Sequence, residues 1–145
     1  MSVATILRRK GTHVDIASPD TTLATAASTM VARETGSLVI LDRGTDHLLG
    51  VLTERDLVRN MVEHGAAALE MAASAVLRSR PTTCGLDDSL RKAMSLMTER
   101  RVRHLPVMAD NTMVGIVSIG DIVKFRLEEI ELEVRVLRDY ARARA

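Results

Sequence analysis

The chain carries Gly50-Val51-Leu52-Thr53-Glu54-Arg55-Asp56 and a close copy of it, Gly115-Ile116-Val117-Ser118-Ile119-Gly120-Asp121. Both stretches begin with glycine, continue with two aliphatic residues and a hydroxyl residue, and place an aspartate three positions after the hydroxyl. An apolar run that ends at Ser or Thr predicts a short buried strand followed directly by a helix, with the hydroxyl residue as N-cap. Each copy is therefore expected to form a strand-to-helix corner.

The similarity between the two copies extends over most of the chain. Apolar residues at 23, 26 and 30 recur 67 positions later at 90, 93 and 97, and those at 38, 40 and 41 recur at 105, 107 and 108. After the next loop the offset falls to 65, because two residues are lost from the turn around Arg43 to Asp46, and loops tolerate such losses. The chain thus contains an internal repeat.

Each half predicts the same order of elements: strand, helix, strand, turn, strand, helix. In the first half we expect strands at 12–16, 37–41 and 48–52 and helices at 22–34 and 53–64. In the second half we expect strands at 81–84, 103–108 and 113–117, a helix at 87–100 and a helix after Ser118. The alanine-rich residues 67–80 are expected to form a short helical linker.

A three-stranded sheet with two helices cannot bury both of its faces alone. The two repeats, at 8–66 and 81–126, are therefore expected to pack on each other about a pseudo-two-fold axis, with the two corners on either side of a shared cleft. The predicted fold class is α+β: two β-α-β-β-α repeats with an extended C-terminal helix over 123–145.

Composition narrows the function further. At 145 residues with 46% hydrophobic content the chain can bury a core, and its net charge of +1 disfavours a nucleic-acid partner. The N-terminal apolar patch precedes Arg8, Arg9 and Lys10, the reverse of a secretory signal, and no run is long enough to span a membrane. We therefore expect a cytoplasmic protein. The single cysteine excludes an internal disulfide, and the histidines lack metal-ligand spacing, so no metal site is expected.

The C-terminal helix carries an apolar stripe with the alternating four- and three-residue spacing of a coiled coil. We call this stripe the seam; charged residues, among them Glu131 and Arg138, flank it. The seam can pack on its own chain or on a partner. A homodimer is favoured, because this helix is too long for a domain of this size to cover along its whole length. The seam consists of Val123, Leu127, Ile130, Val134, Leu137 and Ala141.

These features resemble those of a tandem pair of cystathionine β-synthase (CBS) domains, a regulatory nucleotide-binding module. The resemblance covers residues 10 to about 126. It rests on the duplicated phrase, on T-E-R-D-L-V-R at 53–59, S-P-D at 18–20 and R-H-L-P-V at 103–107. It implies β-α-β-β-α repeats, an adenosine nucleotide in the cleft and an unidentified regulated protein. AMP is the first choice of ligand, with ADP, ATP, NAD(H) and S-adenosylmethionine as alternatives.

The resemblance also implies roles for individual residues. Thr53 and Asp56 would form one ribose corner and Ser118 with Asp121 the other, each aspartate accepting from ribose hydroxyls. Arg103 and His104 match the basic pair that precedes L-P-V in nucleotide-binding members of the family. Both are candidates for the phosphate contact.

The rest of the ligand places further requirements on the chain. Adenine needs an apolar slot and backbone hydrogen bonds at its edge, which Ser37, Leu38 and Ile116 can provide. Lys10 is a second candidate for phosphate. Gly120 would let a ligand approach the backbone closely, so the second corner is the favoured one.

Two plainer interpretations stay open. A hydroxyl residue followed three positions later by aspartate is close to a capping box, so the aspartates can simply stabilise helix starts. Likewise, the basic residues before the L-P-V stretch can form a solvated edge. The chain would then be a dimerisation scaffold without a nucleotide. No catalytic constellation or Walker-type phosphate loop is present, so an enzyme is not expected.

Overall fold

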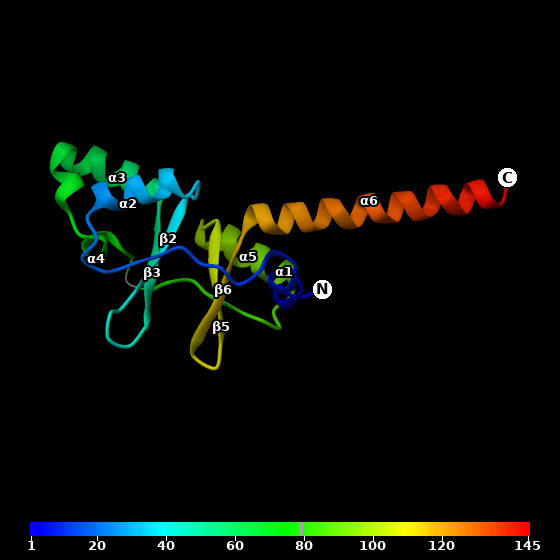
Figure 1. Ribbon diagram of the computed structural model, residues 1–145, viewed down its shortest axis with the longest axis horizontal. Coiled ribbons are helices and arrows are strands. Elements are labelled where there is room, and N and C mark those ends of the chain that lie inside the picture. The colour runs from blue at the N-terminus through cyan, green and yellow to red at the C-terminus, as the bar shows by residue number, and fades with distance from the viewer. Residues whose placement is uncertain (79) are drawn as a thin grey trace.

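The computed structural model describes residues 1–78 and 80–145. Figure 1 shows two repeats side by side and a long helix that projects away from the second. Each repeat contains a three-stranded sheet. The strands are β1 (Ile16–Ala17), β2 (Ser37–Leu41), β3 (Leu48–Thr53), β4 (Cys84–Gly85), β5 (His104–Ala109) and β6 (Thr112–Ser118). The mixed α+β class and the duplicated plan are therefore confirmed.

Seven helical segments accompany the sheets in the described part of the chain. They are α1 (Val3–Lys10), α2 (Leu23–Ala32), α3 (Glu54–His64), the short 3-10 helix η1 (Gly65–Glu70), α4 (Ala73–Val76), α5 (Leu90–Arg100) and α6 (Ile119–Ala143). Helices α3 and α6 begin directly after Thr53 and Ser118, as the repeated phrase predicts.

The two sheets have the same topology and register. In each, the first strand runs parallel to the second and the second antiparallel to the third. Ser37 pairs with Thr53, and His104 pairs with Ser118 at the equivalent place. The first strands are shorter than predicted, because only two residues of each pair with the neighbouring strand. Pro81, which has no N–H, lies outside the second of them.

The two repeats exchange their leading helices. Helix α1 contributes Val3, Ile6 and Leu7 to the core of the second sheet, while α4 contributes Ala73 and Val76 to the core of the first. The placement of residues 8–10 in the first repeat stays a prediction, although α1, to which they belong, packs on the second sheet. The predicted linker is helical, but it forms part of a core, because its alanines are small enough to lie against the sheet.

The exchange explains the glycine that opens each repeated phrase. A Cβ atom on Gly50 would lie 3.2 Å from a methyl carbon of Leu77, and one on Gly115 would lie 3.0 Å from a methyl carbon of Leu7. Both leucines come from the exchanged segments. Glycine therefore leaves the space that lets each segment reach the sheet of the other repeat.

Gly115→Val should lower the free energy of unfolding by about 1–3 kcal/mol, because the added methyl groups overpack the contact with Leu7. Gly44→Val is the matched control, since a Cβ there meets nothing within 4 Å. Its effect should stay within about 0.5 kcal/mol. Denaturant unfolding measures both variants, and equal losses would contradict this account of the glycine.

Helix α6 is anchored only at its beginning. Ile122 and Phe125 are buried in the second core, and Arg9 of α1 contacts α6 through Glu128 and the Phe125 ring. From residue 131 to the end every residue is exposed. The seam therefore does not pack on the described chain. None of the described helices combines the length and the apolarity needed to cross a bilayer.

Candidate functional site

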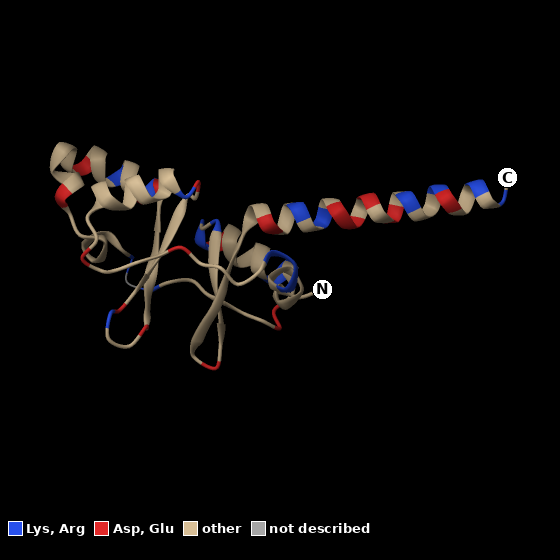
Figure 2. Cartoon of the chain, viewed as in Figure 1, with Lys and Arg blue, Asp and Glu red and all other residues tan. Residues whose placement is uncertain are grey.

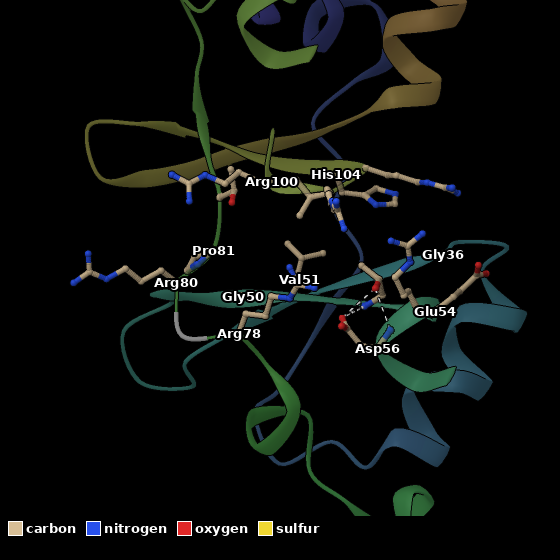
Figure 3. A pocket seen from close by; sticks show the side chains of 16 residues that line it. Gly36, Gly50, Val51, Glu54, Asp56, Arg78, Arg80, Pro81, Arg100 and His104 are labelled. Atoms are coloured by element: carbon tan, nitrogen blue, oxygen red, sulfur yellow. Dashed lines mark hydrogen bonds between the residues drawn. The ribbon is translucent and has the colours of Figure 1, made fainter. Parts of the chain in front are cut away.

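A cavity of about 490 Å³ lies between the two repeats. Figure 3 shows its side chains arriving from both sheets, with His104 on one side and Asp56 on the other. Its size falls in the range of small-molecule sites, roughly 300–1,000 Å³. The lining comes from three places: Gly36 with residues 50, 51 and 53–56, the connecting residues 78 and 80–82, and residues 100–104.

The first corner lies in this cavity. Thr53 caps α3, and the Asp56 carboxylate accepts hydrogen bonds from the Thr53 backbone N–H at 2.9 Å and from its hydroxyl at 3.0 Å. The other carboxylate oxygen accepts from Arg59 at 2.7 Å. A carboxylate has about four acceptor positions, so Asp56 keeps room for about one further donor.

The second corner is occupied by the chain itself. The Lys10 ammonium donates to Asp121 at 2.7 Å and to the Ile116 carbonyl oxygen at 2.9 Å. Burial by itself raises the pKa of Asp121, but the hydrogen bonds from Lys10 and from the Ser118 backbone N–H outweigh it and lower the pKa below its ordinary value. Asp121 is therefore ionised and paired at neutral pH.

Both corners are complete capping boxes. In each, the hydroxyl residue accepts from the aspartate N–H, and the aspartate accepts from the N–H of the hydroxyl residue. The predicted helix-capping role of both aspartates is therefore confirmed. A ligand role for either aspartate would be additional to this cap.

The structure divides the predicted site residues into two sets. Thr53, Asp56, Arg103 and His104 line one cavity, although the sequence placed the first two and the last two in different repeats. The basic pair thus shares a cavity with the first corner, while its backbone lies beside the second corner that the sequence favoured, where His104 pairs with Ser118. This happens because β5 begins at the inter-repeat cavity, opposite the start of α3.

The remaining predicted residues do not line the cavity. Leu38 is fully buried in the first core, and Ser37 is buried beside it. Lys10 is held by the second corner and is not directed at the cavity. The full set outside the cavity lining is Lys10, Ser37, Leu38, Ile116, Ser118, Gly120 and Asp121.

Arginine dominates the charge of the cavity. Six arginines line it, against two carboxylates, those of Glu54 and Asp56. In the part of the chain that the structure describes, none of the six forms an ion pair, although several arginines elsewhere do. The cavity therefore suits an anion. The arginines are Arg55, Arg78, Arg80, Arg100, Arg101 and Arg103.

Sequence reasoning missed most of these arginines. Arg78 and Arg80 lie in the segment predicted as a linker, and Arg55 and Arg100 lie on exposed helix positions. No local signal marked Arg78 and Arg80, because a tertiary contact precedes them: Leu77, the counterpart of Leu7, packs against Gly50.

His104 lies between the two corners and its Nδ1 atom is buried without a hydrogen-bond partner. Desolvation lowers its pKa, opposed by the charge of Asp121 and assisted by those of Lys10 and Arg103, while Glu54 has a small raising effect. The imidazole is therefore neutral at pH 7. A neutral ring can contact a ligand without adding charge to the arginines.

We expect the free energy of unfolding to fall as the pH drops below about 6.5, the ordinary pKa of histidine. The unfolded chain then takes up a proton that His104 in the folded chain resists, so acid favours unfolding. In His104→Gln this part of the pH dependence should disappear. Urea unfolding from pH 7.5 to 5.0 measures both proteins, and parallel pH profiles would contradict the prediction.

Among the described residues, no group of three or more His, Cys, Asp or Glu side chains is arranged to hold a metal ion. The chemistry of the cavity is instead that of hydrogen-bond acceptors beside cationic guanidinium groups.

The family model, a curated relative and a solved structure that match this chain all contain CBS domains. The CBS domain family model matches residues 3–63 and 73–128. A mitochondrial CBS domain-containing protein of Arabidopsis thaliana, CBSX3, is 30% identical over 96% of this chain and 71% of its own length. A crystal structure of a CBS-domain containing protein from Agrobacterium tumefaciens is 37% identical, with a TM-score of 0.83, over 86% of this chain and 92% of that one.

A second structure was determined with a ligand. It is a CBS domain protein from Pyrobaculum aerophilum complexed with AMP, similar in fold with a TM-score of 0.73 and 23% identity. The similarity covers 83% of this chain and 89% of that chain.

Proposed function

This chain belongs to the CBS domain family as a tandem pair, and we propose that it is a regulatory module that binds an adenosine-containing nucleotide in the cavity between its repeats. The proposal rests on one observation: the same cavity contains groups suited to a ribose and groups suited to a phosphate. A carboxylate corner for a ribose shares the cavity with six arginines that form no ion pair among the described residues, and these can bind phosphate. The AMP bound by the fold relative from Pyrobaculum aerophilum is consistent with this ligand class.

The first corner supports the ribose end of the proposal. The Asp56 side chain is mostly buried yet retains acceptor capacity, and a ribose hydroxyl that donates to it would form a charge-assisted hydrogen bond. Arg59 is more exposed than Asp56 and can move aside to release a second acceptor position. Thr53 fixes the carboxylate through the cap.

The phosphate end is supported by Arg103 and by the arginines that join it. Guanidinium groups bind phosphate oxygens in a planar two-bond geometry. Six arginines exceed what a single phosphate requires, so ADP, ATP or NAD(H) should bind at least as well as AMP.

We infer one ligand per chain, at the first corner. At the second corner the Lys10 ammonium neutralises Asp121 through its Oδ2 atom and already takes the Ile116 carbonyl oxygen that an adenine would need. A ligand there would have to displace this ion pair. The two corners thus differ because Lys10, the last residue of α1, contacts the second corner and not the first.

Thermal melting against AMP, ADP, ATP, NADH and S-adenosylmethionine tests the proposal. A bound ligand at 100 times its dissociation constant stabilises by about 2.7 kcal/mol, enough for a clear shift. Calorimetric titration should then give close to one site per chain. No shift with any of the five would overturn the proposal.

A second function, that of a dimerisation scaffold, is favoured by one observation: both aspartates already have a structural role as helix caps. The absence of any nucleotide effect would support it. In either case we infer that the chain acts as a homodimer, because the seam is apolar and exposed along α6.

A further inference from the structure

Helix α6 presents an unpartnered apolar face. It is 25 residues long, and its only buried residues, Ile122 and Phe125, lie within its first two turns. The seam side chains are 40–66% exposed from Val123 to Leu137. Helices in proteins gain most of their stability from packing an apolar face against other elements. We therefore expect the exposed apolar face of α6 to pack against a second helix.

The seam and the contact with the chain's own core lie on different sides of α6. With Leu127 and Val134 at heptad position a, Ile130 and Leu137 occupy position d. Ile122 and Phe125 then fall at positions c and f, away from the seam. The seam is thus free to meet another helix while α6 stays anchored in its repeat.

The charges beside the seam indicate which helix packs on it and in which direction that helix runs. Figure 2 shows basic and acidic bands alternating along α6. Position g holds Arg126 and Glu133, and position e holds Glu131 and Arg138. In a parallel, in-register pair of α6 helices, position g of one copy faces the next position e of the other. Arg126 then meets Glu131 and Glu133 meets Arg138, so both contacts join opposite charges.

The antiparallel register that overlaps all six seam residues joins like charges. When the apolar layers are matched, with Leu127 opposite Leu137, position e faces e and g faces g. Glu131 then lies near its own copy, and so does Glu133. Lys124 would lie near Arg138. All three contacts are repulsive, which disfavours this arrangement.

We propose that two copies of this chain associate through a parallel, in-register coiled coil of their α6 helices, with the two repeat bodies at the same end. The inference deepens the homodimer part of the proposed function and rests on it. Within the described residues, Glu131, Glu133 and Arg138 form no ion pair in their own chain, so they are available to the second copy.

Two variants of equal exposure test whether the seam is the interface. Ile130 is 55% exposed and lies in the seam, while Leu132 is 56% exposed and lies at position f. Ile130→Asp should raise the dimer dissociation constant by roughly 100-fold or more, because it buries a charge in the interface. Leu132→Asp should leave it within about threefold. Sedimentation velocity measures both, and circular dichroism checks that both fold.

Cysteine variants test the direction. In the parallel pair Leu137→Cys lies beside its own copy at position d, and mild oxidation should give a covalent dimer on a non-reducing gel. Val136→Cys should not. Wild type is a further control, since its only cysteine, Cys84, is buried and burial raises the pKa of that thiol to about 11. Cross-linking only in a mixture of Leu127→Cys and Leu137→Cys would overturn the parallel direction.

The charge pairs give a third measurement. Glu133→Arg and Arg138→Glu should each weaken the dimer, and the double variant should restore it, because the pair is re-formed with reversed signs. A monomeric wild type would overturn the proposal. So would a dimer that dissociates on Val62→Asp in α3, another exposed apolar position, but not on Ile130→Asp. The melting shift that nucleotide induces should persist in Ile130→Asp. Loss of the dimer can then be told apart from loss of nucleotide binding.

Discussion

Asp56→Ala should weaken nucleotide binding by about 10- to 100-fold, while Asp121→Ala should leave it nearly unchanged. The lost interaction is a charge-assisted hydrogen bond from ribose to a carboxylate, for which about 1.5–3 kcal/mol is typical. Asp121 makes no such contact in the proposed mode of binding, because it does not line the cavity and is paired with Lys10.

The two variants are matched in their structural cost. Each removes the aspartate of a capping box and one ion pair, with Arg59 in one case and Lys10 in the other. Each should lose about 1 kcal/mol of stability from the cap. Calorimetric titration of both with ATP separates binding from folding. A loss of affinity in Asp121→Ala alone would place the ligand at the second corner, and a loss in neither would favour the scaffold.

The fold could be predicted from the sequence because its signals are local. The repeated phrase contains the strand, the N-cap and the first turn of the helix within seven residues, so α3 and α6 begin where expected. The strand pairs follow from apolar runs around short turns. By contrast, nothing local marks α1 as a partner of the second sheet, since its contacts with Asp88 and Leu86 join distant parts of the chain.

The site was predicted only in part for the same reason. Thr53 and Arg103 were each identified, but their meeting in one cavity depends on how the two repeats are placed relative to each other. The capture of Lys10 by Asp121 depends on the exchange of α1. The arginines of the connecting segment are unremarkable in sequence and become a group only because Leu77 packs on Gly50.

Nucleotide affinity should rise from AMP to ADP to ATP, and Arg100→Gln should reduce that rise. Each added phosphate brings negative charge into a cavity where six arginines lack ion-pair partners among the described residues. An arginine that contacts phosphate is expected to contribute about 10-fold in affinity at an exposed site. The loss should be larger for ATP than for AMP, because the arginines act mainly on the phosphates beyond the first.

Arg91→Gln is the matched control for this second prediction. Both arginines are exposed on α5, but only Arg100 lines the cavity. A change in the long-range field of the protein would affect both variants alike, whereas direct contact affects Arg100 alone. Raising the salt concentration should weaken ATP binding more than AMP binding, since screening acts on the added charges. Equal affinity for AMP and ATP in wild type would mean that the arginines do not meet the phosphate chain, and that the ligand uses the ribose corner with a single phosphate.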